Sequence, residues 1–370
     1  MATKDTRLVR APFEGEVLRL GIVGTGFGAL VHIPAFAEIP GVEIRALCGV
    51  DASRVATIAE RWRIPHTFLD YQQMLSSGEI DALTLAVPPH LHHPMAVAAC
   101  EEGLHVLCEK PLAINAAEAR DLEQMARDSG VCHGVAFHRR YERARMRMKE
   151  MVDQGFIGDL HSVSVIVYRS TLGPGVERPY GWMMQAERGG GVLSTIAPHY
   201  VDQLRWWFGE IHAASGLTMT AVTERAASGF GDVHTIDADD NTAFVLRFAS
   251  GAIGSVNISY TAATDVGEEI VASGSEGMLA IQEPDQIVGA RRGGQVRSVM
   301  ERSKPRPRDE RRHVVPFRQL AADWVAAIRS GMPFEPSFED GARVQEVLDA
   351  VTQSQRLKRW IDLSGEKWPV

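Results

Sequence analysis

The chain has 370 residues, of which 45% are hydrophobic and 23% are charged, and its net charge is −8. This length predicts about two domains, because single hydrophobic cores stop growing beyond roughly 250–300 residues. The negative charge excludes an electrostatic basis for binding nucleic acid or acidic membranes, and no apolar run approaches the roughly 18 residues that cross a bilayer.

Residues 1–16 are polar and contain no apolar signal core. We expect them to form a flexible arm of a cytoplasmic protein. The four cysteines, which lie within the first 132 residues, form no CxxC pair and are expected to be reduced and mostly buried: Cys48, Cys100, Cys108 and Cys132.

The first strong pattern is a glycine turn in the segment Leu18–Ala29 (LRLGIVGTGFGA), which follows strand-like apolar residues and precedes a helical pattern. The spacing Gly24-x-Gly26-x-x-Ala29 matches the dinucleotide-binding fingerprint. Gly24 permits the tight turn, Gly26 leaves room for a pyrophosphate, and Ala29 lets the next helix approach the strand. The amides and dipole of that helix favour an anion at its start. The turn residues expected to contact the cofactor are Gly24, Gly26, Phe27, Gly28 and Ala29.

The second predicted strand, Val42–Val50, leads to an ambiguous cofactor signal. An acidic residue near the end of this strand usually binds the adenosine ribose, and Asp51 in that role indicates NAD. Alternatively, the uncharged Gly49 with Arg54 nearby accepts a 2′-phosphate, which indicates NADP. A third interpretation is that Asp51 only caps the helix Ala52–Trp62. The pattern slightly favours NADP.

A buried strand at Asp81–Val87 is followed by two prolines and three histidines. Adjacent histidines on a turn diverge, and no carboxylate or cysteine completes a ligand set, so we predict no metal site. The residues here that we expect to contact the cofactor are Val87, Pro88 and His92.

The tripeptide Glu109-Lys110-Pro111 follows the predicted strand His105–Cys108. A lysine at the carboxyl end of a parallel strand points into the crevice where ligands bind. Glu109 can hold its ammonium group, and a lysine in such a crevice can shift its pKa and transfer protons. We therefore predict that Lys110 is catalytic and that both residues border the cofactor.

These motifs together resemble the family of glucose–fructose oxidoreductase, inositol dehydrogenase and the rhizopine catabolism protein (Gfo/Idh/MocA). The glycine turn is not specific, but Glu109-Lys110-Pro111 in this position is nearly diagnostic. The other matching stretches are Pro89-His90-Leu91-His92, Glu101–Ala113 (EEGLHVLCEKPLA) and Phe137-His138-Arg139-Arg140, where His138 replaces the family's asparagine at the cofactor.

The resemblance implies an α/β Rossmann domain over residues 17–138, with a parallel doubly wound sheet. It implies an α+β domain over 139–370 with a large, open, mostly antiparallel sheet, which often forms oligomers. We accordingly expect a homodimer or homotetramer, with closing helices Phe317–Ser330 and Phe338–Trp360 that pack at the domain junction.

The second domain begins with a basic helical segment, Arg139–Gln154, in which methionines are predicted to be buried and arginines to form a solvated rim. The strands that follow are predicted at Leu160–Tyr168, Thr218–Val222, Thr242–Phe248 and Ala252–Tyr260, with a hairpin over Ile270–Ile281. The polar segment Arg291–Arg312 is predicted to be a mobile excursion.

A glycine-rich helix start, Gly189–Glu210, contains the second set of candidate residues. Thr195, His199, Asp202 and Trp206 recur at helical spacing and are expected on nearly one face. His199 is either a buried structural residue or an acid/base group.

The family resemblance implies that an aspartate and a histidine at this place join the lysine around the reacting carbinol. Here His199 matches, but Thr195 stands at the aspartate position and Ala197 at a glycine position. A threonine cannot act as a carboxylate base, although it can hydrogen-bond a substrate hydroxyl. Lys110 and His199 therefore remain as the acid/base pair, and the residues expected to contact substrate are Lys110, Trp182, Thr195 and His199.

The resulting prediction is an NAD(P)-dependent oxidoreductase that acts on a sugar, cyclitol or related polyol. Two alternatives remain open: an enzyme that recycles bound NAD through a transient keto sugar, such as a glycosidase or an eliminating enzyme, and a nucleotide-binding regulator without catalysis. Fold analogy cannot choose among them.

Overall fold

The computed structural model describes residues 15–226, 232–282, 285–300 and 312–365. These residues belong to two compact units, the first from Met1–Tyr141 with Pro307–Ala342 and the second from Glu142–Arg306 with Arg343–Val370. The described residues 312–342 thus group with the first unit, whereas the sequence places them in the second domain. The boundary at residue 138 stays a prediction.

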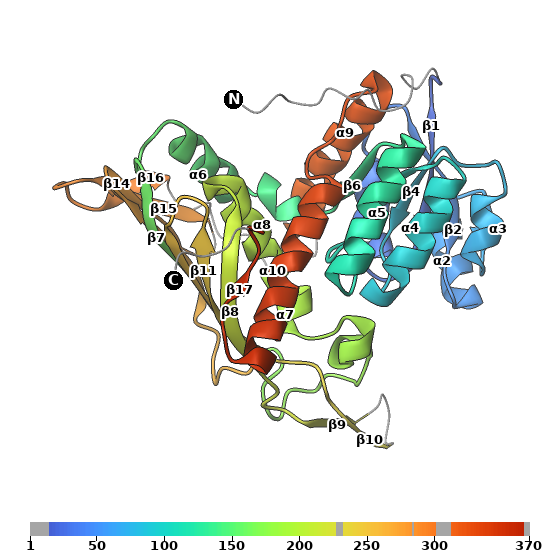
Figure 1. Ribbon diagram of the computed structural model, residues 1–370. Helices are drawn as coiled ribbons and strands as arrows, with labels where there is room; N and C mark the ends of the chain where they lie inside the picture. Colours follow the sequence, from blue (N-terminus) through green and yellow to red (C-terminus); the bar gives the residue numbers. More distant parts are fainter. Residues whose placement is uncertain (1–14, 227–231, 283–284, 301–311, 366–370) are drawn as a thin grey trace. The chain divides into compact units, whose positions relative to one another are not determined.

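The first unit contains a six-stranded parallel sheet in the order β3-β2-β1-β4-β5-β6 (Figure 1). Its strands are β1 (Leu18–Val23), β2 (Val42–Cys48), β3 (His66–Phe68), β4 (Ala82–Leu85), β5 (His105–Cys108) and β6 (His133–Val135). This is the predicted Rossmann architecture. The strand order reverses between β1 and β4, and ligands of such sheets bind at the carboxyl ends of the strands beside that point.

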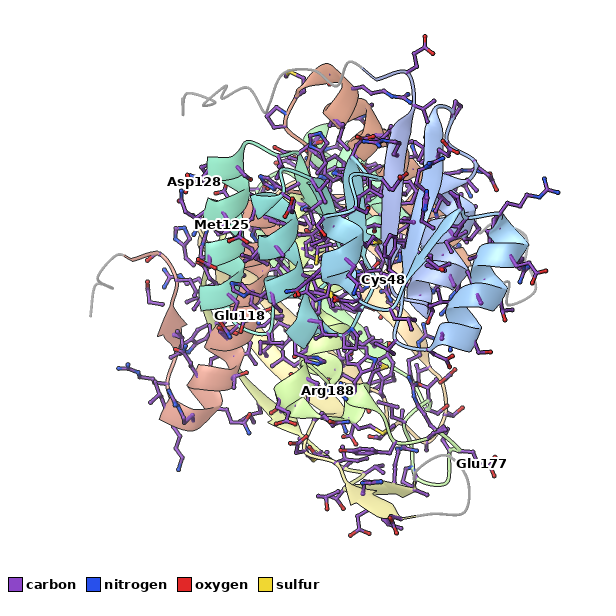
Figure 2. The ribbon with its side chains drawn as sticks, turned by 90° about the vertical axis from the view of Figure 1, so that its right-hand side faces the viewer. Cys48, Glu118, Met125, Asp128, Glu177 and Arg188 are labelled. Atoms are coloured by element: carbon purple, nitrogen blue, oxygen red, sulfur yellow. The ribbon has the colours of Figure 1, made fainter. Side chains whose placement is uncertain are left out.

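Helices cover both faces of this sheet. Those of the first unit are η1 (Gly28–His32), α1 (Ile33–Phe36), α2 (Ala52–Trp62), α3 (Tyr71–Leu75), η2 (Pro89–Leu91), α4 (His92–Glu101), α5 (Ala116–Ser129), η3 (His138–Tyr141) and α9 (Val314–Ser330). Apolar residues of α1, α2 and α9 share one core with the strands, and Phe317 and Trp324 of α9 are fully buried there. On the other face α4 packs beside α5, which carries Glu118, Met125 and Asp128 (Figure 2).

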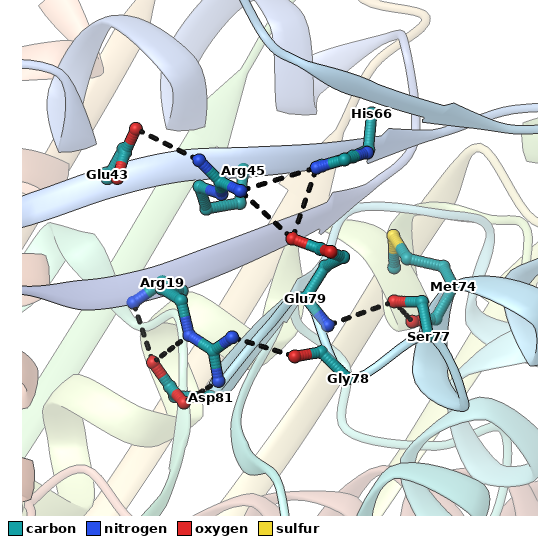
Figure 3. A network of polar contacts seen from close by, with 9 residues as sticks. All are labelled: Arg19, Glu43, Arg45, His66, Met74, Ser77, Gly78, Glu79 and Asp81. Carbon is teal, nitrogen blue, oxygen red and sulfur yellow. Dashed lines mark hydrogen bonds and ion pairs between the residues drawn. The ribbon is translucent and has the colours of Figure 1, made fainter.

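Ion pairs cluster toward the amino ends of these strands (Figure 3). Arg19 of β1 donates to both carboxylate oxygens of Asp81, at 3.0 and 2.6 Å. Arg45 of β2 and His66 of β3 share the carboxylate of Glu79, at 3.0 and 3.1 Å. These groups are partly exposed, and such pairs contribute little to stability. They lie at the edge opposite the candidate ligand site.

The second unit contains a nine-stranded sheet in the order β16-β15-β14-β13-β7-β12-β11-β8-β17. Its strands are β7 (Leu160–Tyr168), β8 (Ile211–Met219), β11 (Asn241–Phe248), β12 (Ile253–Ser259), β13 (Gly267–Gly274), β14 (Gly277–Gln282), β15 (Gln286–Arg291), β16 (Arg297–Met300) and β17 (Ile361–Asp362); β9 (Glu224–Ala226) and β10 (Val233–Thr235) form a separate pair. Only β7 and β12 run parallel, so the sheet is mixed and mostly antiparallel, as expected.

One face of this sheet is covered and the other is open. Along most of β11 and β12, buried and exposed residues alternate, as in a strand with one solvated face. The helices of the unit are α6 (Arg143–Asp153), η4 (Trp182–Met184), η5 (Ala186–Arg188), α7 (Val192–Thr195), α8 (Ala197–Phe208) and most of α10 (Phe338–Leu357). Near the end of α10, the Ser354 hydroxyl accepts from the Gly216 amide of β8, which fixes this helix to the sheet.

Several predicted elements need correction. The expected strand Thr218–Val222 is the longer β8, which ends at Met219. The expected mobile segment Arg291–Arg312 includes strand β16, and its residues 301–311 lie outside the described part. Arg145 is not part of a solvated rim, because it is only 3% exposed. It pairs with Glu142 and Glu268, and these two carboxylates offset the cost of burying its charge.

All four cysteines are free and buried, as predicted. Burial raises the pKa of Cys48 (Figure 2) and of Cys100 to about 11, so these thiols are protonated at neutral pH. None of the helices in the described residues is both long enough and apolar enough to traverse a membrane.

Candidate functional site

The glycine turn after β1 has the shape that a pyrophosphate requires. Gly24 has φ +113°, and a Cβ atom there would lie 2.1 Å from the Ala86 carbonyl oxygen, so only glycine fits. A Cβ atom on Gly26 would meet nothing within 4 Å. The turn therefore combines a forced glycine with open space beside the backbone, which fits the phosphates of a dinucleotide.

The helix after this turn begins as a π-helix, η1, and continues as α1. The Ile33 amide bonds to the Gly28 carbonyl, five residues back. Pro34 has no amide hydrogen and cannot make the next i→i−4 bond, which accounts for an irregular ladder here. This local geometry turns the side chain of His32 into the buried interior of the unit.

Three residues that follow β2, Gly49, Asp51 and Arg54, are the candidates for contacting the adenosine end of a dinucleotide. The Asp51 carboxylate accepts from the Arg54 amide at 3.0 Å and caps α2. This bond is compatible with each of the three interpretations of Asp51. The Arg54 guanidinium donates to the Thr25 carbonyl of the glycine turn at 2.9 Å. A Cβ atom on Gly49 would lie 2.7 Å from Thr25 Cγ2, so no carboxylate can stand at this position without rearrangement.

Glu109 and Lys110 lie at the carboxyl end of β5, beside a buried histidine. Oε1 of Glu109 lies 3.2 Å from Nε2 of His32, and its Oε2 accepts from the Lys110 amide at 3.2 Å. A carboxylate only accepts, so the His32 ring nitrogen is the donor. The other ring nitrogen of His32 lies 2.8 Å from the hydroxyl oxygen of Thr84 in β4.

Neighbouring charges give Glu109 and Lys110 perturbed pKa values. Burial raises the pKa of Glu109, but the hydrogen bond from His32 and the charge of Lys110 outweigh it and hold the pKa at about 2. Burial lowers the pKa of Lys110; Glu109 opposes this change and Arg139 adds to it. A lysine with a lowered pKa beside a fixed carboxylate is a candidate proton-transfer group.

His92 connects the carboxyl ends of β4 and β5. It is fully buried, and its ring nitrogens lie 2.8 Å from the Pro111 carbonyl oxygen and 2.9 Å from that of Val87. Burial lowers the pKa of His92, whereas the two carbonyl oxygens raise it, since only a protonated ring donates to both. His92 thus positions the chain directly after Lys110.

His138 and His313 form a histidine pair in the first unit. Arg312 Nε donates to His313 Nε2 at 2.9 Å, and His313 Nδ1 lies 3.3 Å from His138 Nε2. Burial lowers the pKa of His138 to about 3 and that of His313 to about 4, so both rings are neutral at pH 7. Phe27 of the glycine turn contacts both rings, with centroids 6.0 Å apart in each case.

In the second unit, the glycines before α7 allow close backbone contacts. Gly191 has φ +94°, and a Cβ atom there would lie 2.1 Å from an Asp239 carboxylate oxygen. A Cβ atom on Gly190 would collide with the carbonyl oxygens of Met183 and Gln185. The Gly191 amide donates to the Met183 carbonyl, which joins the Trp182 segment to the start of α7.

Thr195 and His199 lie on two short helices and not on one. The chain breaks at Ile196 between α7 and α8, where φ is −115°. Thr195 is 4% exposed and His199 5% exposed. The Thr195 hydroxyl donates to the Gly191 carbonyl at 2.6 Å, a bond within its own turn.

Asp239 is the carboxylate that holds this turn. Its Oδ2 accepts from the Leu193 amide at 2.9 Å, and its carbonyl accepts from the Val192 amide at 2.9 Å. Burial raises the pKa of Asp239 to about 7, the Leu193 amide opposes this change, and the neighbouring Asp240 adds to it.

The predicted residues thus occupy two sets. The first unit brings together the glycine turn, the strand ends and Lys110 with their neighbours; the second contains Trp182, Thr195 and His199. Sequence reasoning missed His32, Thr84, His313 and Asp239. A polar residue within an apolar strand or at an apolar helix start, such as Thr84 in Ala82–Leu85, is a sequence signal by which such residues can be recognised. Among the described residues, no group of three or more His, Cys, Asp or Glu side chains could hold a metal ion.

Comparisons with known proteins match both parts of the chain. The model of the oxidoreductase family with an NAD-binding Rossmann fold matches residues 18–137, and the GFO/IDH/MocA C-terminal domain matches residues 146–280. Levoglucosan dehydrogenase of Pseudarthrobacter phenanthrenivorans is 28% identical over 94% of this chain and 98% of that protein. Myo-inositol 2-dehydrogenase of Thermotoga maritima is 24% identical over 94% and 98%.

Solved structures agree with the sequence matches. Levoglucosan dehydrogenase in its apo form superposes with a TM-score of 0.87 at 26% identity, covering 95% of this chain and 100% of that one. Its complex with NADH and L-sorbose gives a TM-score of 0.85 at 26% identity, covering 94% and 99%. The resemblance seen in the motifs is therefore confirmed over both domains: the chain is an oxidoreductase of the Gfo/Idh/MocA family with an NAD-binding Rossmann domain.

Proposed function

We propose that this oxidoreductase transfers a hydride between nicotinamide and a secondary alcohol or ketone of a sugar, cyclitol or related polyol. Two relatives that span nearly the whole chain are named as dehydrogenases of levoglucosan, an anhydro sugar, and of myo-inositol, a cyclitol. A carbohydrate or cyclitol hydroxyl is therefore the substrate group we propose here.

The observation that carries the proposal is the position of Lys110. It follows β5 at the carboxyl end of the Rossmann sheet, where ligands of this fold bind, and burial lowers its pKa. A lowered pKa brings the ammonium group closer to the range in which it exchanges protons at neutral pH. Glu109 and His92 hold the backbone on either side of it.

The proposal gives each candidate residue one role. Nicotinamide, when bound, accepts or supplies the hydride. In the oxidative direction, Lys110 or His199 takes the proton of the substrate hydroxyl. The oxygen of Thr195 accepts a hydrogen bond from a substrate hydroxyl, a role that suits a side chain standing where relatives of this family carry an aspartate. Trp182 contributes apolar surface for the sugar ring.

Replacing Lys110 tests this assignment. Lys110→Ala is expected to reduce turnover of a responsive polyol by at least about 100-fold, the usual contribution of a proton-transfer group. Binding of the reduced nucleotide, NADPH or NADH, measured by fluorescence is expected to change little. Lys149→Ala is the matched control, because Lys149 lies on α6 and pairs with Asp153. Near-normal turnover of Lys110→Ala would contradict the proposal.

For the nucleotide, we propose a preference for NADP. No carboxylate stands at Gly49, and that of Asp51 is used in capping α2. Arg54 lies against the glycine turn through Thr25, where its guanidinium can meet a 2′-phosphate. The test compares the thermal stabilisation of wild type and Arg54→Ala by NAD⁺ and NADP⁺. The variant is expected to lose affinity for NADP⁺ selectively; an equal loss for both would contradict the preference.

Because Thr195 stands where the family carries an aspartate, one alternative function is also tested: an enzyme that recycles tightly bound NAD through a transient keto sugar. Such an enzyme would retain its cofactor on purification and show no net change in the absorbance of reduced nicotinamide during turnover. A stoichiometric absorbance change with product formation supports the dehydrogenase. A regulator would bind nucleotide without turning over any polyol.

We also propose that the chain forms a homodimer or homotetramer through the open face of the nine-stranded sheet. Apolar side chains on this sheet remain exposed, among them Leu217 at 64%, Met219 at 56% and Ile253 at 60%. Apolar residues exposed on an open sheet face are candidates for an interface. Light scattering of the wild type and of Ile253→Glu measures the assembly; an unchanged mass in the variant would contradict this surface.

A further inference from the structure

We propose that His32 is a positioning residue for Lys110, that it acts through Glu109, and that Thr84 holds the His32 ring in place. This inference rests on the proposed function, because it treats Lys110 as a proton-transfer group. It adds two residues, Thr84 and His32, that do not belong to the motifs by which the family is recognised here.

A continuous chain of hydrogen bonds connects these four residues. The Thr84 hydroxyl and His32 Nδ1 are 2.8 Å apart, His32 Nε2 and Glu109 Oε1 are 3.2 Å apart, and Glu109 Oε2 accepts from the Lys110 amide at 3.2 Å. Each end of the Glu109 carboxylate is thus held by a different donor. The chain joins the helix that follows the glycine turn to the ends of β4 and β5.

The His32 ring has little freedom to leave this arrangement. It is 0% exposed, the Phe317 ring stacks on it with centroids 4.1 Å apart, and the Phe27 ring contacts its edge at 5.8 Å. A buried histidine whose only role is to fill space needs no carboxylate partner. Here the partner is the side chain directly before Lys110, which is why we assign a positioning role.

The effect on Lys110 follows from the charge of Glu109. Burial and Arg139 lower the pKa of Lys110, and the Glu109 carboxylate raises it. His138 and His313 also lie within the electrostatic range of these two groups. Without the His32 donor, Glu109 is less well stabilised as an anion and is free to turn. The pKa of Lys110 is then expected to fall further.

The experiment measures Lys110 directly, without substrate. Trace acetylation with acetic anhydride at a series of pH values, read by peptide mass spectrometry, gives the pH at which Lys110 becomes half reactive. Lys149 on α6 serves as the internal reference. Because Pro111 follows Lys110, trypsin does not cleave there, and the labelled and unlabelled forms appear on the same peptide.

Four variants separate positioning from packing. His32→Leu fills the space but cannot donate, and we expect the Lys110 profile to move to lower pH by at least about half a unit. His32→Gln places an amide donor near Nε2 and is expected to stay close to wild type. Thr84→Val removes the hydroxyl and is expected to give a smaller shift in the same direction. Glu109→Gln removes the negative charge itself and is expected to move the Lys110 profile furthest toward low pH.

His93→Gln is the matched control, because His93 lies on α4 and pairs with Asp121 at the surface. An unmoved profile in folded His32→Leu, or equal profiles in His32→Leu and His32→Gln, overturns the proposal. If His32→Leu does not fold, Thr84→Val decides: an unmoved profile overturns the proposal. The proposed function is tested by a different experiment: full turnover in Lys110→Ala would contradict it. The labelling result would still be valid in that case, because it needs no substrate.

Discussion

Glu109 in the first unit and Asp239 in the second are buried or largely buried carboxyl groups, and each accepts a hydrogen bond from a backbone amide. Burial raises the pKa of both, yet the pKa of Glu109 is about 2 and that of Asp239 about 7. The hydrogen bond from His32 and the charge of Lys110 act on Glu109 in the opposite direction. The neighbour that acts on Asp239 is another carboxylate, Asp240.

The difference shows that burial alone does not decide the charge of a carboxyl group. Around Glu109, an ionised carboxylate is part of the arrangement that orients Lys110. Around Asp239, the protonated acid and the carboxylate are close in free energy at neutral pH. The first unit therefore contains a permanently charged centre, and the second contains a group that titrates under physiological conditions.

The largest expected effect comes from removing the charge of Glu109. Its folded-state pKa lies below the ordinary value of 4.5, so ionisation stabilises the fold above about pH 4.5, and this stability is lost as the pH falls toward 2. Glu109→Gln should lower the free energy of unfolding at neutral pH by about 3 kcal/mol. Urea unfolding at several pH values measures this loss, which should shrink below pH 4.5. If wild type and Glu109→Gln were equally stable at every pH, ionisation of Glu109 would not stabilise the fold, and the lowered pKa would be contradicted.

A smaller effect of opposite sign is expected for Asp239. Its folded-state pKa lies above the ordinary value of 3.8, so its contribution to stability is fully present below about pH 4 and is lost as the pH rises through 7. Asp239→Asn keeps an oxygen for the Leu193 amide and cannot ionise. The variant should therefore be the more stable protein above pH 7, by roughly 2 kcal/mol after allowance for partial exposure.

The same unfolding experiment decides the Asp239 prediction. Wild type should lose stability between pH 4 and 8 relative to Asp239→Asn. A constant difference between the two proteins over this range would contradict the raised pKa. Because the carboxyl group holds the start of α7, the pH dependence of substrate binding should change in the same variant.

The smallest effect is expected at Asp81, a carboxylate with a cation beside it but near the surface. Arg19 pairs with Asp81 at 2.6 Å, and their side chains are 39% and 18% exposed. Asp81→Asn should cost about 0.5–1 kcal/mol, and salt should reduce the difference. Thermal unfolding at low and high salt measures it. If Asp81→Asn lowered the free energy of unfolding as much as Glu109→Gln does, the presence of a nearby cation would determine the size of the loss, and burial of the carboxylate would not contribute.

The sequence was sufficient to predict the elements with strong periodicity or clear end signals. Helix Ala52–Trp62 and strands His105–Cys108 and Leu160–Tyr168 have the predicted bounds, since caps and alternation are local properties. The helix containing Thr195 and His199 was predicted as continuous but breaks at Ile196. Its spacing alone could not reveal that Asp239, more than 40 residues away, holds the first turn.

Local patterns thus determined the glycine turn, the family, the two fold classes and the candidate Lys110 and His199, because these depend on residues adjacent in the chain. Tertiary structure alone decided which charges surround each carboxyl group. The donors to Glu109 come from a helix 77 residues earlier and from the next residue, and no spacing rule relates His32 to Glu109. A pKa depends on what packs around a group in space, which is why the opposite behaviour of Glu109 and Asp239 appears only in the folded chain.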